Sequence, residues 1–405
     1  MHVRLRTILI TVSLVLVGYI VIGGALGKSN STNDQTYRDL GVYSEVLSRI
    51  KSNYVTEPDL EKVTRGAIRG LLEALDPYST YFTPKEFQDY LSHPDPAPAS
   101  VGLFLSKRFG FATVVSVLPG SPADKAGIRP GDLLDRINDT PARERSVVQL
   151  ERELAGEPGT IVNVRVVKGA QGEPQLIKLT RVVLEDPPVV AKMVDDGDGY
   201  VRVASFDKGE AQEIRAKVNE LKGQGATRIV LDLRNCAGGQ VGEAVETASL
   251  FMNSGLIAYT MGQQSPRQDI MAKPSGTVFQ MPLAVLINRS TAGPSELVAD
   301  AILDNKRGDV VGIPSFGVGV VQKVIPVGDG SGLLLSIAKY YGPDGKAIED
   351  NGVTPDVISP TESEASGFNP QTPPEQPEQF GGKDDLQLQK AIEVLKQAAQ
   401  PAKAA

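Results

Sequence analysis

Apolar positions near the start of the chain recur at the spacing of an α-helix. In "VYSEVLSRIKSNYV", Val42, Val46, Leu47 and Ile50 fall on one face, and a second helical run, "LEKVTRGAIRGLLEAL", follows. The Asp-Pro and Thr-Pro steps of "DPYSTYFTP" end that second run. We therefore predict an N-terminal helical segment over residues 40–92, preceded by a polar spacer, "NSTNDQ".

The next stretch follows the two-residue alternation of β-strands. After the proline-rich linker "SHPDPAPAS", the segments "AGIRPGDLLDRIN", "TIVNVRVVKG" and "PQLIKLTRVV" are predicted to contain short strands separated by glycine and proline turns. One helix is expected near residues 147–155. Residues 99–183 should therefore form one compact β-rich module.

From Gly199 onward, predicted strands alternate with predicted helices. The strands are "YVRVASF", "RIVLDLR", "PLAVLIN" and "GDVVGI", and the helices are "EAQEIRAKVNELKGQG", "GEAVETASLFMNSG" and "SELVADAILDNK". This order is typical of an α/β domain, which we place at residues 190–360. A linker predicted to be disordered, residues 361–382, leads to a terminal helix at 384–399. The whole chain is thus predicted to be a multidomain α/β protein.

The first 28 residues have the features of a membrane-targeting segment. Residues 8–27 carry no charge, and Arg4 and Arg6 precede them. An apolar helix of about 20 residues spans the roughly 30 Å hydrocarbon core of a bilayer, and flanking positive charge stays on the cytoplasmic side. We expect a single-pass anchor with an extracytoplasmic body, on the periplasmic or cell-surface side. A signal peptide cleaved after "ALG" is the alternative.

The composition narrows the possible chemistry. The chain has 405 residues and a formal net charge of −7, which does not favour nucleic acid as a partner. The single cysteine, Cys236, excludes an internal disulfide. The two histidines, His2 and His93, lie ahead of the apolar segment and in the proline-rich linker. A Ser-His-Asp triad therefore has no suitable base, Cys236 has no histidine to activate it, and no metal or cofactor is expected.

Several motifs resemble those of the carboxyl-terminal processing peptidases, also called tail-specific proteases. "AIRGLLEALDPYSTYF" resembles the N-terminal helical segment of that family, and "GSPADKAGIRPGDLLDRIN" resembles its PDZ domain. Four further segments resemble the catalytic core of that family. They are "VLDLRNCAGGQVGEAVETASLF", "INRSTAGPSELVADAILDNKRGDVVG", "SFGVGVVQ" and "KYYGPDGKAIEDNGVTPDV". The resemblance covers about residues 42–357 and the last helix, and it implies a serine peptidase fold that uses a serine and a lysine.

Both reactive residues of that family are replaced in this chain. The position of the nucleophile in the family's Ser-Ala-Ser-Glu turn is Gly293, and the position of the lysine in its Phe-Gly-Lys-Gly loop is Val318. The two positions keep the family's separation of 25 residues, and Gln322 matches the glutamine that supports the lysine. Glycine has no hydroxyl and valine carries no proton, so the nucleophile and its base are both absent. Loss of the nucleophile costs a serine hydrolase about 10⁶ in rate.

The oxyanion hole is affected as well. The family uses the backbone N–H after the nucleophile, and this position is Pro294, which has no N–H. Losing one such donor costs about 10²–10³ in rate. Gly238 and Gly239 in "RNCAGGQ" match the glycine turn that faces the active site and would form the other half of the hole. Ser295 is the candidate for a displaced nucleophile, with helix N-capping as its alternative role. Other nearby hydroxyl or amine groups are Ser290, Thr291, Lys306 and Lys323.

The PDZ-like module keeps its binding features. Val101, Gly102, Leu103 and Phe104 in "SVGLFL" match the loop whose backbone N–H groups hold a terminal carboxylate, and the next strand accepts the peptide by β-addition. Two hypotheses remain. The first is a pseudopeptidase that binds C-terminal segments of exported polypeptides or assembles with an active relative. The second is a serine endopeptidase with a displaced nucleophile such as Ser295.

Overall fold

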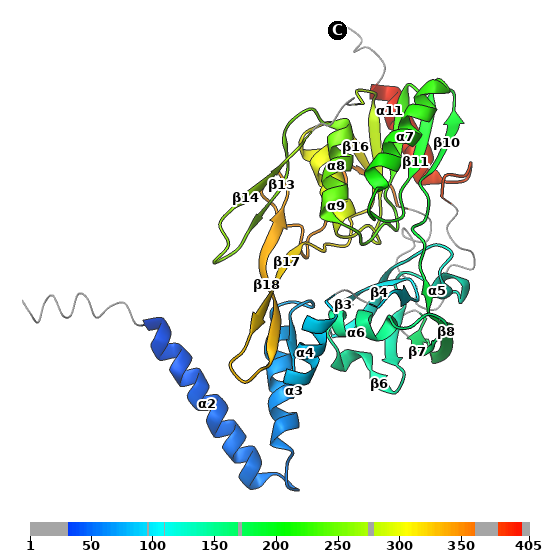
Figure 1. The fold of residues 1–405 in the computed structure, drawn as a ribbon. Coiled ribbons are helices and arrows are strands. Elements are labelled where there is room, and N and C mark those ends of the chain that lie inside the picture. The colour runs from blue at the N-terminus through cyan, green and yellow to red at the C-terminus, as the bar shows by residue number, and fades with distance from the viewer. Residues whose placement is uncertain are drawn as a thin grey trace, which may run out of the picture. The chain divides into compact units, whose positions relative to one another are not determined.

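The computed structural model describes residues 31–94, 97–108, 110–168, 172–273, 279–360 and 380–398 (Figure 1). Contacts divide the chain into two compact units, residues 1–70 and 71–405. The predicted anchor at residues 8–27 lies outside the described residues, as does nearly all of the predicted linker at 361–382. Among the helices that are described, none is both long enough and apolar enough to cross a membrane.

The first unit holds two helices, as the sequence predicts. Helix α2 spans Ser31–Asn53, and helix α3 (Leu60–Glu73) continues three residues past the boundary of the unit. Residues 31–35 of the predicted polar spacer "NSTNDQ" are helical instead, because α2 already begins at Ser31, and Asn30 lies outside the described residues. Small polar residues are common at helix N-termini, where they accept bonds from free backbone N–H groups, so this stretch suits the first turn of a helix.

The second unit starts with a short strand and helix that join a larger sheet. Strand β1 (Thr80–Phe82) pairs antiparallel with β18 (Gly332–Tyr341). Helix α4 (Pro84–Ser92) is capped by Thr83, whose N–H donates to Glu86 while its hydroxyl accepts from the Glu86 N–H. Phe82 and Phe87 pack against Leu334. Strand β1 lies inside the segment for which the sequence predicted helices.

Residues 99–183 form the predicted β-rich module. Its main sheet has the order β3-β4-β5-β7-β8, with β3 at one edge. The strands of this sheet are β3 (Leu103–Arg108), β4 (Phe111–Val117), β5 (Leu133–Ile137), β7 (Ile161–Val167) and β8 (Pro174–Thr180), and β6 (Thr140–Pro141) pairs with β5. Strand β2 (Ala99–Ser100) pairs with β9 (Val182–Val183). The helices are α5 (Pro122–Lys125), the 3₁₀ turn η2 (Ala142–Glu144) and α6 (Val147–Leu154).

The peptidase-like core is built on a six-stranded, mostly parallel sheet. Its order is β10-β11-β12-β15-β16-β19, and only β10 runs antiparallel to its neighbour. The strands are β10 (Val190–Asp195), β11 (Asp198–Arg202), β12 (Arg228–Asp232), β15 (Leu283–Ile287), β16 (Asp309–Gly312) and β19 (Val357–Ile358). This sheet confirms the α/β alternation predicted from the sequence.

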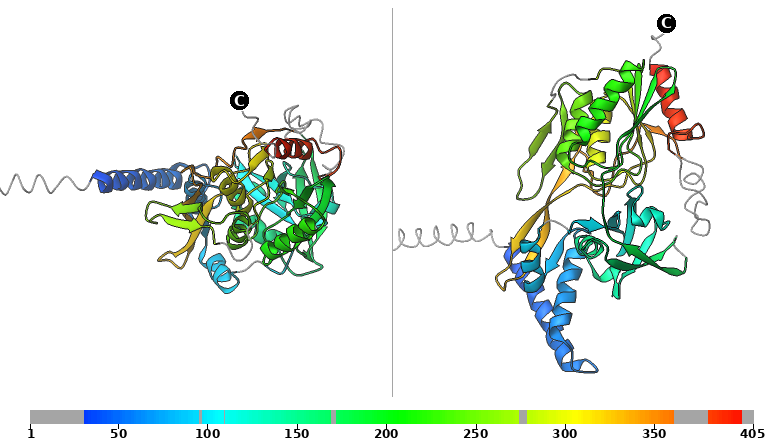
Figure 2. Two further views of the ribbon diagram at one scale, coloured as in Figure 1. Left: turned by 90° about the horizontal axis from the view of Figure 1, so that it is seen from above. Right: turned by 45° about the vertical axis from the view of Figure 1, so that its right-hand side comes forward.

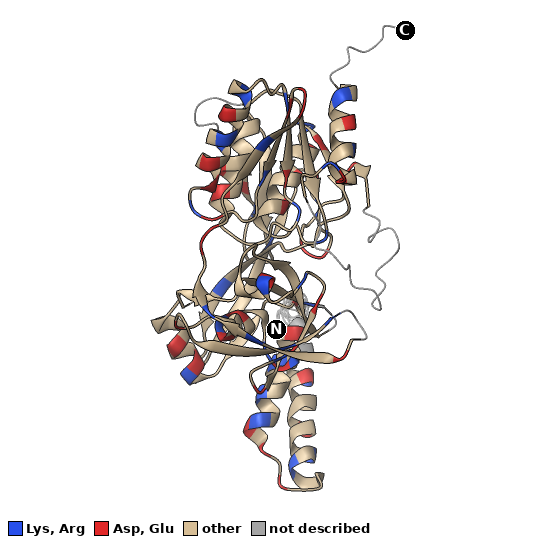
Figure 3. Cartoon of the chain, turned by 90° about the vertical axis from the view of Figure 1, so that its right-hand side faces the viewer, with Lys and Arg blue, Asp and Glu red and all other residues tan. Residues whose placement is uncertain are grey.

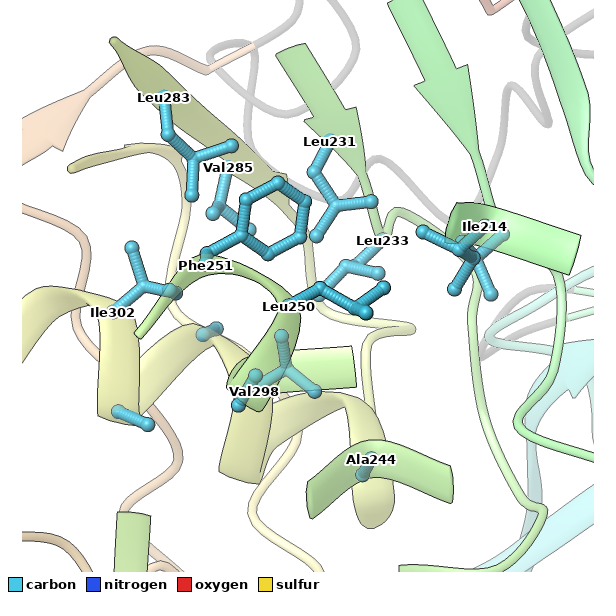
Figure 4. Close-up of a cluster of buried hydrophobic side chains, with 14 of the residues drawn as sticks. Ile214, Leu231, Leu233, Ala244, Leu250, Phe251, Leu283, Val285, Val298 and Ile302 are labelled. Carbon is cyan, nitrogen blue, oxygen red and sulfur yellow. The ribbon is translucent and has the colours of Figure 1, made fainter. Parts of the chain in front are cut away.

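Helices cover both faces of the sheet, as Figure 2 shows. Helices α7 (Glu210–Gly223), α8 (Val241–Phe251) and α9 (Pro294–Asp304) pack on one face, and α11 (Leu386–Ala398) packs on the other. In Figure 4, Phe251 and Leu250 of α8 and Val298 and Ile302 of α9 converge on strand residues such as Leu231. The central strands β11, β12, β15 and β16 are almost entirely buried because both of their faces are covered, whereas the edge strands β10 and β19 are partly exposed.

A buried arginine ties α11 to the sheet. Arg234, just after β12, donates to both carboxylate oxygens of Asp232 (2.9 and 2.6 Å) and of Asp385 (2.9 and 2.6 Å). The guanidinium carbon also lies 4.4 Å from the centre of the Phe380 ring. Arg234 is only 1% exposed, so these bonds form away from water.

A second sheet, which the sequence analysis missed, lies beside this core. It contains β13 (Leu256–Met261), β14 (Gln268–Met271), β17 (Val320–Pro326) and the strands β1 and β18. Strand β17 begins directly after the loop at residues 313–319, so its pairing with β18 fixes where that loop ends. This is the loop in which the sequence places Val318.

Candidate functional site

The turn before α9 is fastened to the loop after β12. The Thr291 hydroxyl donates to the Leu233 carbonyl at 2.8 Å, and the Ala292 N–H donates to the Cys236 carbonyl at 3.0 Å. Asn288 adds a side-chain bond to Asn235 at 2.8 Å. These bonds place Gly293 next to the glycine turn, so the structure brings together the two segments that the sequence analysis assigned to one site.

Gly293 ends this turn in an unusual backbone conformation. Its φ is 65° and its ψ is −123°, in a region that residues with a Cβ rarely adopt. A Cβ atom at this position would meet no heavy atom within 4 Å. The site of the expected nucleophile is therefore an open position on a strained turn, such as the turns that present nucleophiles in serine hydrolases. Pro294 follows as the first residue of α9.

One buried carboxylate joins this turn to the loop that holds Val318. Glu296 accepts hydrogen bonds from the N–H groups of Gly293 (2.8 Å), Gly317 (2.7 Å) and Val318 (2.8 Å). The Ser315 hydroxyl donates to it at 2.5 Å. Burial raises the pKa of Glu296 to about 7, although these four donors favour the ionised form. Glu296 thus fixes the backbone at positions 293 and 318 relative to each other, and we call this arrangement the frame of the site.

The sequence analysis quoted Glu296 only as part of a motif and gave it no role. A usable signal exists, because a glutamate at the third position of a helix often reaches back to the residue before the helix. The bond from the Gly293 N–H is of this kind. The bonds to Gly317 and Val318 depend on the tertiary fold and have no local signal.

The loop around Val318 is shaped by a second buried carboxylate. The Gly319 N–H donates to Glu349 at 2.7 Å, and Gly317 has a φ of 93°. The side chain of Val318 packs against the hydrophobic core of the β-rich module. Gln322, which the family uses to support the lysine, donates instead to the Tyr78 carbonyl at 2.9 Å. Position 318 therefore makes an apolar contact between two parts of the second unit.

Two consecutive glycines with positive φ form the glycine turn, which the sequence predicts to be half of an oxyanion hole. Gly238 and Gly239 have φ values of 83° and 98°, and a Cβ on Gly239 would overlap the backbone of Phe206. Ala237 and Ala292 form a parallel β-bridge. Within the described part of the chain, the N–H groups of Gly238 and Gly239 have no protein acceptor. They are therefore free to donate to a ligand, whereas Pro294 has no N–H to add.

Ser295 is the second residue of α9, and its side chain is not exposed at this opening. The residue is fully buried, and its hydroxyl donates to the carbonyls of Cys236 (2.8 Å) and Ala292 (2.9 Å). Cys236 is fully buried as well, and burial raises the pKa of its thiol. The Ser295 hydroxyl thus fastens the two turns together. Ser290 and Thr291 are buried in the same turn, while Lys306 lies just past the end of α9 and Lys323 lies on β17.

The predicted carboxylate-binding loop precedes β3. Gly102 has a φ of 81°, and a Cβ there would overlap the side chain of Ser121. The carbonyls of Val101 and Gly102 accept bonds from Ala123 and Leu118, but the Gly102 N–H has no partner among the described residues. Since β3 is an edge strand, its outer side is open to an added strand.

The two apolar residues of this loop take different directions. Leu103 packs against the core of the β-rich module. The ring of Phe104 lies 3.4 Å from where a Cβ of Gly238 would stand. On the neighbouring strand, the Ser116 hydroxyl donates to the Asn235 carbonyl at 2.7 Å. The expected peptide-binding loop therefore lies directly against the glycine turn of the core.

Family models match three consecutive parts of the chain. Residues 198–359 match peptidase family S41, residues 113–168 match a PDZ domain, and residues 24–85 match the N-terminal domain of the activating protease CtpB. These matches agree with the peptidase-like core, the β-rich module and the helical segment in order and position.

Curated relatives and solved structures give the same assignment. The chain is 30% identical to a carboxy-terminal-processing protease of Bartonella bacilliformis, over 82% of this chain and 78% of that protein. It is 29% identical to the carboxy-terminal processing protease CtpA of Bacillus subtilis, over 82% and 70% respectively. A photosystem II D1 C-terminal processing protease matches in structure with a TM-score of 0.66 and 28% identity, covering 79% of this chain and 92% of that one. The chain belongs to the carboxyl-terminal processing peptidases of peptidase family S41, and it carries a PDZ domain.

Proposed function

We propose that this chain is a pseudopeptidase, which binds polypeptide C-termini without cleaving them. The observation that carries the proposal is the pair Gly293 and Val318, which occupies the nucleophile and base positions of a frame held together by Glu296. Pro294 adds a third loss, because it removes one oxyanion donor. The frame is kept while the nucleophile, the base and one of the oxyanion donors are missing.

Binding is proposed to occur at the carboxylate loop of the PDZ domain. The free Gly102 N–H and the open edge of β3 support this role, since a terminal carboxylate needs backbone donors and the peptide needs a strand to pair with. The proposed ligands are C-terminal segments of exported polypeptides. An active family relative is the second proposed partner. Residues 8–27 are proposed to anchor the chain in the membrane, with its body outside the cytoplasm.

The alternative function is a serine endopeptidase that uses Ser295. Two features argue against it: the hydroxyl is fully buried, and its hydrogen is directed to backbone carbonyls. A nucleophile needs a base within hydrogen-bond reach, and neither carbonyl can act as one. The proposal of an inactive site is therefore better supported than the alternative.

Incubation of the purified full-length chain in detergent with an unfolded reporter protein tests the absence of peptidase activity. We expect no cleavage above the rate of a protein-free sample. Cleavage that disappears in Ser295→Ala, while Ser290→Ala still cleaves, would establish Ser295 as the nucleophile and overturn the proposal.

Peptide titration tests the binding function. A labelled peptide with an apolar last residue should bind as the free acid and bind weakly when amidated, because the loop N–H groups lose a charged acceptor. Gly102→Ser should abolish binding, since the new side chain collides with Ser121. Gly110→Ser is the matched control, because Gly110 also has a positive φ but faces open space. Equal affinity for acid and amide peptides would contradict the assignment of this loop.

A further inference from the structure

Helix α6 of the PDZ domain carries an acidic side chain that has no partner. Acidic and basic residues are interspersed along the chain, as Figure 3 shows, and the charged neighbours of Glu151 on α6 are bonded to other groups. Glu153 accepts from Arg145 at 2.7 Å, and Arg152 donates to the His93 carbonyl at 2.9 Å. The side chain of Glu151 makes no hydrogen bond or ion pair within the described part of the chain.

Glu151 lies at the margin of the buried face of α6. Val147, Leu150 and Leu154 are buried in the hydrophobic core of the PDZ domain, and residues three or four apart share a helix face. Glu151 follows Val147 by four positions and precedes Leu154 by three. It remains partly exposed, but burial raises the pKa of its carboxyl to about 7. A partly desolvated carboxylate without a donor is unfavourable, and its exposed part leaves it open to a ligand that supplies N–H groups.

Helix α6 runs antiparallel alongside the open edge strand β3. At one end, Ala99, ahead of the carboxylate-binding loop, exchanges two backbone hydrogen bonds (2.9 and 3.3 Å) with Gly156, which follows α6. At the other end, Lys107 of β3 donates to the carbonyl of Arg145, which precedes α6, at 3.1 Å. Between these ends, α6 packs on β3. Glu151, midway along α6, is therefore placed beside the middle of β3, and the carboxylate-binding loop lies near the C-terminal end of the helix.

A polypeptide bound at this edge would present alternate side chains to α6. With its terminal carboxylate at the free Gly102 N–H, the polypeptide would pair antiparallel with β3 and extend along α6. Strand side chains alternate, so the last residue and the third from the end share a face, about 7 Å apart. Glu151 lies about 4.5 Å along the helix axis from Leu154, on the way from the loop. The third residue from the end is therefore the one that reaches Glu151.

We propose that Glu151 selects a lysine or arginine as the third residue from the end of the polypeptide held by the PDZ domain. The inference rests on the proposed binding function and names the class of C-terminus that the domain takes. An ammonium or guanidinium group supplies the N–H donors and the positive charge that Glu151 lacks within the protein. The apolar stem of such a side chain also covers surface next to the buried face of α6.

Three labelled peptides with a free carboxylate and valine as the last residue provide the test. They differ only in the third residue from the end, which is lysine, glutamine or glutamate. We expect the full-length chain in detergent to bind the lysine peptide about tenfold more tightly than the glutamine peptide, and the glutamate peptide least tightly. Equal affinity for the three peptides would remove the subsite and leave the PDZ function intact. Failure of all three to bind would contradict the PDZ function and the subsite together.

Variants at position 151 identify the residue that makes the selection. Glu151→Gln should reduce the preference for lysine over glutamine to within about twofold, and Glu151→Lys should reverse the order so that the glutamate peptide binds best. Glu173→Gln is the matched control, because it removes an exposed acid beside β8, at the opposite edge of the sheet from β3, and should retain the preference. A lysine preference that persists unchanged in both variants of Glu151 would assign the selection to another residue and overturn the inference.

Thermal unfolding separates this role from a structural one. Because no protein group stabilises the ionised carboxyl, Glu151→Gln should keep or raise Tm and should bind the glutamine peptide as tightly as the native chain does. A lower Tm together with weaker binding of all three peptides would indicate a structural carboxylate and decide against selection by Glu151.

Discussion

Gly293 adopts a conformation that suits glycine better than the serine that the family resemblance implies for this position. Its φ of 65° is unfavourable for any residue with a Cβ, although the space around that Cβ is open. A serine there would add backbone strain of about 1–3 kcal/mol, and active sites tolerate such strain where it is part of the mechanism. If the chain is a pseudopeptidase, as proposed, no activity offsets this cost, so glycine is the more stable choice at position 293.

Gly293→Ser alone should therefore lower the free energy of unfolding by about 1–3 kcal/mol and produce no activity. Urea unfolding checks the stability change. Gly159→Ser is the matched control, because Gly159 has a φ of 82° and open space at its Cβ but lies outside the site. Similar decreases in the free energy of unfolding in the two variants would show that the backbone conformation causes the destabilisation. A more stable Gly293→Ser variant would contradict the prediction.

Restoring peptidase activity should require three substitutions together. Gly293→Ser supplies the hydroxyl, Val318→Lys supplies the amine, and Pro294→Ala returns the oxyanion N–H. Because Glu296 already holds positions 293 and 318 in place, we expect slow cleavage of an unfolded protein by the triple variant. Each double variant serves as a control and should be at least about 10²-fold slower. A triple variant as inactive as the native chain would show that the pocket no longer keeps the lysine neutral.

At the scale of elements, the attachment of α11 depends on one buried ion pair. Arg234 is shared between Asp232 on the sheet and Asp385 just before the helix. Removing Asp385 leaves Arg234 paired with Asp232 but deprives the buried guanidinium of its two hydrogen bonds to Asp385, and hydrogen bonds to charged groups are worth about 1.5–3 kcal/mol. Asp385→Ala should therefore destabilise the protein by that amount and speed hydrogen exchange in α11. Asp384→Ala, one residue earlier and exposed, should change neither quantity. Unchanged exchange in Asp385→Ala would mean that apolar packing alone holds the helix.

The sequence predicts the elements whose periodicity is strong and misses those defined by distant pairing. Strands β12 and β15 are covered on both faces, so they appear as continuous apolar runs between helical patterns. Strands β17 and β18 carry mixed burial patterns and a register shift between Val321 and Gln322, which hide the two-residue alternation. The start of α2 was missed because its first turn is polar.

The candidate site was also predictable only in part, because some of its contacts join residues far apart in the sequence. Motif order and spacing place Gly293 and Val318, since both belong to local turns. The bond between Ser116 and Asn235 joins residues 119 positions apart, and the packing of Phe104 on Gly238 depends on the same approach. Contacts of this kind follow from how the PDZ domain meets the core and leave no mark in a short stretch of sequence.

At the scale of the whole molecule, buried carboxylates control how stability depends on pH. Burial raises the pKa of Glu296 and of Glu349 to about 7 and that of Glu210 to about 8. Between about pH 4.5 and these values, the folded chain keeps protons that the unfolded chain has released. Their stabilising contribution is therefore complete below about pH 4.5 and is lost as the pH rises towards 8.

Asp385 acts in the opposite direction at lower pH. Burial favours its neutral form, but the hydrogen bonds and charge of Arg234 lower its pKa below the ordinary value. The stability that Asp385 contributes is present above the pKa of an unfolded aspartate, about 3.9, and is lost in stronger acid. The two effects together predict that the free energy of unfolding is greatest near about pH 4.5–5 and declines on either side.

Urea unfolding of the full-length chain between about pH 3.5 and pH 8.5 measures this profile. Glu296→Gln should flatten the decline between about pH 5 and pH 7, because a glutamine at this position neither binds nor releases a proton. Glu246→Gln, an exposed acid, should keep the native slope. A free energy of unfolding that rises from pH 5 to pH 8 would contradict the prediction. It would show that the four donors around Glu296 stabilise its ionised form more than burial destabilises it.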